Sequence, residues 1–227
     1  MKKYIFNNQS SLWGEPECIG FGTDDFYVKE IDKKKSNKII IENHYSKKGD
    51  SIAHNKINLG IFNNIKLIGV LQYGYAMNPA SCDKIVEDTK INEYLELNRM
   101  WIADNVGKYP ESKSISYSIK YIRKKYPNIK WIQSFADERC GGFGIVYQAC
   151  SFNYFGEHKS VFWEIDGEVY HNSILTNNKR KAKYKLKDKK KDAIKKELRQ
   201  FRYIKFLDQR EKKKCLLKEQ PYPKHYK

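Results

Sequence analysis

Apolar residues along this chain fall into short runs separated by polar turns, a pattern that is typical of β-strands. The clearest two runs cover residues 57–62 and 65–74, with Asn63-Asn64 between them. An asparagine pair between two apolar runs predicts a β-hairpin. Further strands are expected at 26–31, 94–102, 129–135, 152–155, 161–165 and 168–170.

Between these strands the apolar spacing changes to that of helices. A long helix is predicted over about 111–126, where apolar residues recur on one helical face and prolines stand at both ends. Shorter helices are expected at 34–43 and around Tyr147. This order of elements predicts an α/β fold with a mixed central sheet flanked by helices. The residues that indicate the long helix are Pro110, Ile115, Ile119, Ile122, Tyr126 and Pro127.

The composition changes after Thr176, where lysines dominate. Apolar residues still recur there at helical spacing, which predicts an amphipathic basic helix. We therefore expect a catalytic-type domain over 1–175 and a lysine-rich helical arm over 176–227. The apolar stripe of the arm would dock on the domain, pair with a second copy, or contact a partner. It consists of Ala193, Ile194, Leu198, Phe201, Ile204 and Leu207.

The charge is as unevenly distributed as the composition. The protein has a net charge of +17, and residues 176–227 hold 21 basic and 6 acidic side chains, against 23 and 21 in the rest. A nearly neutral domain followed by a basic segment favours an anionic polymer, double-stranded DNA, as the partner. The alternative is a solvated or lipid-contacting tail.

Two further features concern the cellular setting. No stretch approaches the roughly 18 apolar residues that a membrane span needs, and the N-terminus lacks the apolar run of a signal peptide. The five cysteines are scattered without a Cys-x-x-Cys pair. That pattern fits a reducing, cytoplasmic setting and argues against a structural zinc site.

The run from Trp131 to Cys150 is the strongest candidate for a functional site. An apolar strand delivers Asp137 into a glycine-rich turn, which opens a short helix with Tyr147. Active sites of α/β enzymes commonly lie where a buried strand ends beside a helix start. The alternative is structural, because Asp137 would also cap the next helix and the glycines would also permit close packing.

Other polar groups stand at element ends or on the preceding strand. His44, Tyr45 and Ser46 follow the expected short helix, and histidine is a frequent base and metal ligand, although a single histidine can also be structural. Glu96 and Arg99 on the strand at 94–102 are site candidates or an internal ion pair. A histidine, aspartate and tyrosine set would suit a metal such as iron.

The start of the long helix is a candidate anion site. Its backbone N–H groups and positive end favour a phosphate, and the side chains of Ser112, Lys113 and Ser114 add donors. Ordinary capping by serine is the alternative.

Taken in order, these segments resemble the Mom family of bacteriophage DNA-modification proteins over about residues 38–160. The resemblance rests on His44-Tyr45-Ser46, Leu95-Glu-Leu-Asn-Arg-Met-Trp, Glu111-Ser112 and Ser134-Phe-Ala-Asp137…Gly144-Ile-Val-Tyr147-Gln-Ala. It implies a fold related to GNAT acetyltransferases and conversion of adenine in DNA to an N6-carbamoylmethyl derivative, which shields DNA from restriction endonucleases. An acetyl-CoA-type donor and an iron requirement are implied as well.

The same resemblance implies roles for individual residues. His44, Tyr45, Asp137 and Tyr147 would form the metal or catalytic set, with iron held by His44, Asp137 and Tyr147. Glu96, Arg99, Ser112 and Ser134 would support the site.

Two departures from the family pattern stand out. The resemblance predicts a Gly-His-x-Gly turn after the aspartate, and this chain has Gly141-Gly142-Phe143-Gly144. The Gln/Arg-x-x-Gly-x-Gly/Ala loop of ordinary GNAT enzymes is absent before the helix at Glu111, where Gly107 alone stands.

Two other functions stay open on sequence grounds. One is a GNAT-type acyltransferase that acts on a protein or a small amine. The other is a non-enzymatic basic protein that binds DNA.

Overall fold

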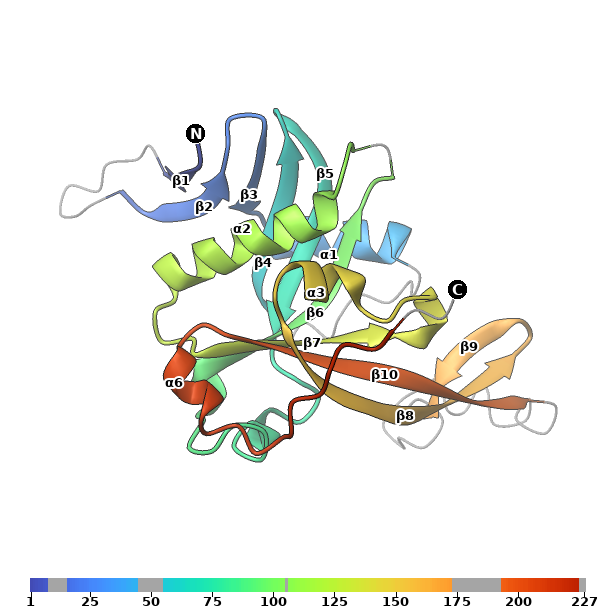
Figure 1. The fold of residues 1–227 in the computed structure, drawn as a ribbon. Helices are drawn as coiled ribbons and strands as arrows, with labels where there is room; N and C mark the ends of the chain where they lie inside the picture. Colours follow the sequence, from blue (N-terminus) through green and yellow to red (C-terminus); the bar gives the residue numbers. More distant parts are fainter. Residues whose placement is uncertain (8–15, 45–54, 105, 173–192, 225–227) are drawn as a thin grey trace.

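The fold is described from a computed structural model, which places residues 1–7, 16–44, 55–104, 106–172 and 193–224. Within these ranges the chain forms one sheet in the order β1-β2-β3-β4-β5-β6-β7-β10-β8-β9, flanked by helices (Figure 1). The strands are β1 (Lys3–Phe6), β2 (Cys18–Gly22), β3 (Phe26–Glu30), β4 (Asn55–Asn63), β5 (Lys66–Gly74), β6 (Tyr94–Ile102), β7 (Trp131–Asp137), β8 (Asn153–Ile165), β9 (Glu168–His171) and β10 (Ile194–Phe206). The predicted α/β fold, a mixed central sheet flanked by helices, is therefore confirmed.

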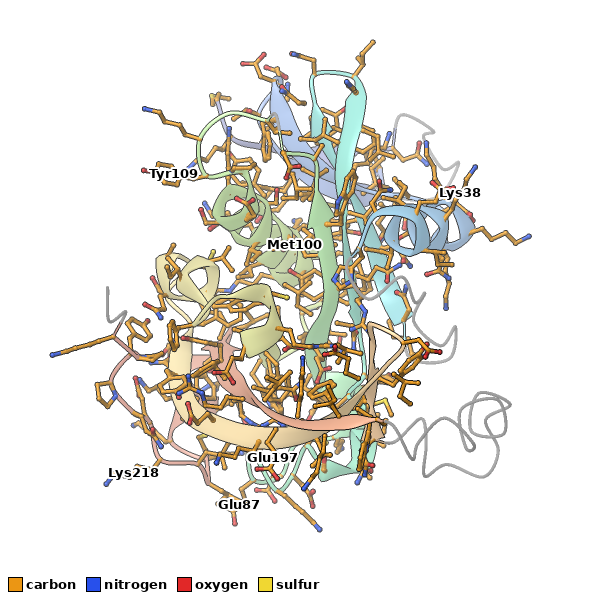
Figure 2. The ribbon with its side chains drawn as sticks, turned by 90° about the vertical axis from the view of Figure 1, so that its right-hand side faces the viewer. Lys38, Glu87, Met100, Tyr109, Glu197 and Lys218 are labelled. Atoms are coloured by element: carbon orange, nitrogen blue, oxygen red, sulfur yellow. The ribbon has the colours of Figure 1, made fainter. Side chains whose placement is uncertain are left out.

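Two helices cover opposite faces of this sheet. In α1 (Lys33–Asn43) Ser36 accepts a hydrogen bond from Gln72 of β5, and in α2 (Pro110–Lys125) Ser118 lies 2.5 Å from the hydroxyl of Tyr73, the next residue of β5. Consecutive strand residues point to opposite faces, so α1 and α2 lie on opposite sides. Figure 2 shows the sheet nearly edge-on, with Lys38 of α1 on one side and Tyr109, before α2, on the other.

Most elements lie where the spacing predicts them. The hairpin is β4–β5, and the expected helices are α1, α2 and α3 (Ile145–Ala149). Strands β1 and β2 add to the expected set, and one long strand, β8, replaces the two short ones expected at 152–155 and 161–165. None of the described helices is long and apolar enough to cross a membrane.

The predicted amphipathic helix after residue 193 is wrong, because residues 194–206 form β10. This strand pairs antiparallel with β7 on one side and β8 on the other, so it lies within the sheet and not in a helical arm. Phe201 and Tyr203 pack into the main core, while Ile204 and Phe206 pack into a second cluster with Trp131. A strand buried on both faces loses simple alternation, and its apolar residues here imitate helical spacing. Residues 176–192 of the expected arm lie outside the described ranges.

The sheet opens between β6 and β7, its one parallel pair. These strands pair only from Tyr94–Glu96 to Trp131–Gln133, although β6 continues to Ile102 and β7 to Asp137 (Figure 1). Just beyond the last pair, the hydroxyl of Ser134 donates to the carbonyl of Leu97 over 3.1 Å. Beyond this point the described residues of β6 and β7 no longer pair with each other, and residues on both sides of the gap line a cavity.

Candidate active site

A cavity of about 400 Å³ lies where β6 and β7 diverge. Its wall combines residues of β6, β7, the glycine-rich turn and α3 with the end of α1. Met100 of β6, one of the lining residues, lies at the centre of the molecule in Figure 2. Four of the predicted site residues line it: His44, Arg99, Asp137 and Tyr147.

Asp137 ends β7 and is held by Arg139. Its Oδ1 accepts the backbone N–H of Arg139 over 3.0 Å, and its Oδ2 accepts from Nε and Nη2 over 2.9 and 2.5 Å. The guanidinium of Arg139 also lies 4.4 Å from the ring centre of the buried Phe162. Asp137 therefore caps the short 3₁₀ turn Glu138–Cys140 and also lines the cavity, while its catalytic role stays a prediction.

His44 reaches the cavity from the opposite direction, at the C-terminal cap of α1. Its side chain is buried, and removal from water lowers the pKa of its imidazole from 6.5 to about 4, assisted by the positive charges of Arg99 and Arg139. The imidazole is therefore neutral near physiological pH and can accept a hydrogen bond or a proton. Tyr45 and Ser46 lie outside the described residues.

Tyr147 and Ser134 form the inner end of the site. The Ser134 hydroxyl lies 2.9 Å from the Tyr147 hydroxyl and 3.1 Å from the Leu97 carbonyl, and its single proton can be donated to either of them. Burial raises the pKa of Tyr147 to about 12, so its phenol is protonated at neutral pH. A neutral phenol with a fixed orientation can donate a hydrogen bond to a bound group. Ser134 therefore acts through Tyr147 and does not line the cavity itself.

Glu96 lies one step behind the cavity wall. Its Oε1 accepts from the side-chain amide of Asn98 over 3.2 Å, and its Oε2 accepts from Gln133 over 2.8 Å. Arg99 lines the cavity and donates from Nη1 to the Asn98 carbonyl over 2.7 Å. Glu96 is thus a supporting group, whereas Arg99 brings positive charge to the cavity.

The helix start at 111–114 is separate from this cavity. Ser112 and Ser114 donate their hydroxyls to the carbonyls of Tyr109 and Pro110, over 3.3 and 2.7 Å. The Lys113 ammonium lies 4.3 Å from the ring centre of Phe26. Neither serine is the N-cap, because that position is Tyr109, which makes no side-chain capping bond. The alternative of serine capping is therefore wrong, and the anion site stays a prediction.

The donors expected to bind iron do not fit that role as they stand. The carboxylate of Asp137 is engaged by Arg139 on both oxygens, and the phenol of Tyr147 is protonated. Among the described residues, no group of three or more histidine, cysteine, aspartate or glutamate side chains could hold a metal ion. Of these three expected donors, His44 is the one that presents a neutral nitrogen suited to a metal.

The glycine-rich turn explains the departure from the expected histidine motif. The position of that histidine is Gly142, which lines the cavity and has room for a Cβ, whose nearest neighbour would be a backbone nitrogen at 3.9 Å. By contrast, Gly144 has φ of +80° and a Cβ there would lie 2.4 Å from the Tyr203 ring. The turn requires Gly144 and only tolerates Gly142.

Sequence reasoning missed two residues of this wall, Asn98 and Phe135, and two arginines that contact wall residues, Arg139 and Arg202. Arg139 stands two positions after Asp137, a spacing that suits a side-chain pair in a tight turn. Asn98 and Phe135 lie in strands, where they alternate with residues that face the main core. This alternation was the sequence signal that could have identified them. Arg202 was obscured by the helical spacing of its segment.

Comparison with known proteins finds a relative by sequence and several solved structures of low sequence identity. The chain is 42% identical over 228 residues to methylcarbamoylase Mom of Escherichia phage Mu, covering 98% of this chain and 94% of that protein. Among solved structures, a ribosomal-protein-S5-alanine acetyltransferase from Vibrio fischeri is 11% identical with a TM-score of 0.48, covering 84% of this chain and 97% of that one. A GNAT-family acetyltransferase from Streptococcus pneumoniae is 14% identical with a TM-score of 0.46, covering 80% and 98%.

The sequence also matches the Mom protein family over residues 25–224, which includes every cavity residue described above. The match extends through β10, so the family's shared region includes the strand that completes the sheet. On these two grounds, the chain belongs to the Mom protein family.

Proposed function

We propose that this protein modifies DNA, converting adenine to an N6-carbamoylmethyl derivative that protects the DNA from restriction endonucleases. Family membership supports the proposal, as does the relative from phage Mu, which is named a methylcarbamoylase. One structural observation carries it furthest. Four residues that the resemblance assigns to the site come from α1, β6, β7 and α3 and line a single cavity.

The chemistry of the wall suits transfer to a weakly basic amine. His44 is neutral and can accept a proton from the amine as it attacks. The protonated phenol of Tyr147 and the guanidinium of Arg99 can donate hydrogen bonds to an oxygen of the transferred group. Asp137 pairs with Arg139, whose charge, like that of Arg99, acts on His44.

Adenine N6 lies inside the base stack of duplex DNA, so the base must leave the duplex to reach this cavity. Extrusion costs roughly a few kcal/mol, which contacts to the flipped base and to the backbone repay. The net charge of +17 favours binding to phosphates. Residues 176–192 hold nine basic and two acidic side chains and make a large contribution to this charge.

The resemblance implies an acyl-CoA donor. Direct attack of the adenine amine on its thioester carbonyl, with the CoA thiol leaving, gives an N6-acyl adenine, so a carbamoylmethyl product also requires a nitrogen donor and an oxidant. The start of α2 has no side-chain cap, which is consistent with a phosphate there. The thiol of Cys150, just after α3, donates to the Ser112 carbonyl over 3.2 Å and connects that helix start to the element that carries Tyr147. Iron, where it is required, would supply Lewis-acid or redox chemistry, and His44 is the described donor best suited to it.

The test is nucleoside mass spectrometry of plasmid DNA from cells that express the protein. We expect a modified deoxyadenosine with the wild type and its loss in Asp137→Asn, which weakens the charged contact to Arg139. Glu157→Asn, at an exposed position of β8 away from the cavity, is the control and should preserve the adduct. Acyl-CoA binding with unmodified DNA would instead favour an acyltransferase of another amine.

A further inference from the structure

Phe135 is a half-buried aromatic residue of β7 that lines the cavity. Its contacts from neighbouring strands come from one side. The guanidinium of Arg202 on β10 lies 4.8 Å from its ring centre, and His158 on β8 packs edge-on at 5.5 Å and 88°. In the sheet order, both strands lie on the same side of β7.

Phe135 also lines the cavity at the gap where β6 has diverged from β7. Across that gap β6 contributes Met100 and Asn98 to the cavity wall. An aromatic ring that is packed against neighbouring strands and also lines a cavity is a suitable surface for a flat heterocycle. A cavity of about 400 Å³ lies within the usual size range of small-ligand sites.

Asn98 adds a hydrogen-bond acceptor to this wall. Its amide nitrogen donates to the Tyr75 carbonyl and to Glu96 Oε1, each over 3.2 Å. These two acceptors fix the orientation of the side-chain amide, since the oxygen could not replace the nitrogen there. Its Oδ1 is buried and, within the described chain, accepts no hydrogen bond. A buried acceptor beside a cavity is satisfied when a ligand supplies a donor.

Glu96 holds both features in place. One carboxylate oxygen binds Asn98, and the other binds Gln133, whose own oxygen accepts from Arg202 Nη1 over 3.1 Å. Arg202 in turn lies against Phe135. Hydrogen bonds from Asn98 through Glu96 and Gln133 to Arg202, followed by the cation–π contact of Arg202, therefore connect the acceptor to the aromatic ring.

We infer that Phe135 and Asn98 form the slot for the target base, an inference that rests on the proposed function. Phe135 stacks on the face of the extruded adenine, and Asn98 Oδ1 accepts a hydrogen bond from its exocyclic amino group. Every base can stack on an aromatic ring, whereas thymine has no exocyclic amine. The stacking surface thus binds the base, and the acceptor discriminates bases that carry an exocyclic amine from thymine. Glu96, Gln133 and Arg202 are positioning residues of this slot.

The test compares Phe135→Leu with Phe62→Leu, the same change at a half-buried aromatic of β4 that packs on Tyr27 and is away from the cavity. Nucleoside mass spectrometry measures adenine modification of a plasmid, and a gel shift measures affinity for the same plasmid. We expect Phe135→Leu to lower modification about 5- to 160-fold, the range of lost base stacking. DNA affinity, which depends mainly on backbone charge, should change less than about twofold. Phe135→Tyr should restore most of the modification, and Phe62→Leu should leave it unchanged.

Asn98→Ala provides an independent second variant, with thermal unfolding as the check that it folds. Lower modification with unchanged DNA affinity supports the slot. If Phe135→Leu and Asn98→Ala both fold and modify adenine as the wild type does, the slot is overturned while the proposed function stands. If the wild type itself leaves adenine unmodified, the proposed function is overturned and the slot with it.

Discussion

At the scale of single residues, the site depends on side chains that contact each other across the chain. His44, Asp137 and Tyr147 are separated in sequence by up to about a hundred residues, and their convergence on one cavity could be expected only from the resemblance. Asp137 was identifiable from its place after a buried strand. Its engagement by Arg139 was not, because the sequence does not show which way a turn directs an arginine.

Glu138 gives a prediction of pH dependence at this scale. Its carboxylate accepts three hydrogen bonds from Arg199, over 2.7, 2.8 and 3.0 Å, which hold its pKa below the ordinary value of 4.5. A depressed carboxyl pKa stabilises the fold above the ordinary pKa, and this contribution disappears as the pH falls below it. We expect Glu138→Gln to lower the free energy of unfolding by about 1 kcal/mol at neutral pH and by less near pH 3.

Urea unfolding at the two pH values measures this difference. The matched control is Glu157→Gln, because Glu157 meets the same arginine through one contact of 3.6 Å. That variant should have a smaller effect. A deficit for Glu138→Gln that does not change with pH would show that the carboxylate's charge is not what stabilises the turn.

At the scale of elements, the hairpin β4–β5, strand β6 and helix α2 follow directly from local spacing and prolines. The conformation of the segment 194–206 does not follow from its local spacing, because it depends on the strands that pair with it. Between β7 and β8 it gains backbone hydrogen bonds on both sides, and aromatic and β-branched residues favour that environment over a solvated helix. Tertiary pairing here overrides a helical spacing that the isolated sequence shows.

This assignment of β10 predicts a stability cost that a helical arm would not show. Phe201 is almost fully buried in the main core, so Phe201→Ala should lower the free energy of unfolding by about 3–5 kcal/mol. Ile194 lies at the exposed start of the same strand, and Ile194→Ala should cost less than about 0.5 kcal/mol. Denaturant unfolding of both variants provides the measurement. Equal, small losses of unfolding free energy in both variants would show that the segment is not part of the sheet but an independent arm.

At the scale of the whole molecule, a mixed sheet holds the cavity, and the proposed function assigns the attraction of DNA to the basic composition. Composition predicted the charge and its concentration after residue 176, but not that part of this segment completes the sheet. Removing 177–227 would therefore remove β10 along with the charge. Substitution of lysines outside the described strand separates the two effects.

Neutralising Lys187, Lys189, Lys190 and Lys191 to glutamine tests the contribution of charge. Each lysine that contacts a phosphate adds about 0.9 to the slope of log affinity against log salt concentration. We expect weaker DNA binding, a shallower slope and unchanged thermal unfolding. Fluorescence anisotropy of a labelled duplex over a salt series measures the slope. An unchanged slope would mean that these lysines do not contact the DNA.

The central claim, that the cavity between β6 and β7 modifies adenine in DNA, is tested most directly by nucleoside mass spectrometry of plasmid DNA from cells expressing Tyr147→Phe or Tyr154→Phe. Both changes remove one phenolic hydroxyl from a buried ring, but only Tyr147 lines the cavity. The account predicts a modified deoxyadenosine with the wild type and Tyr154→Phe, and at least a tenfold reduction with Tyr147→Phe. Equal amounts of modified deoxyadenosine in the two variants, or none with the wild type, would contradict it.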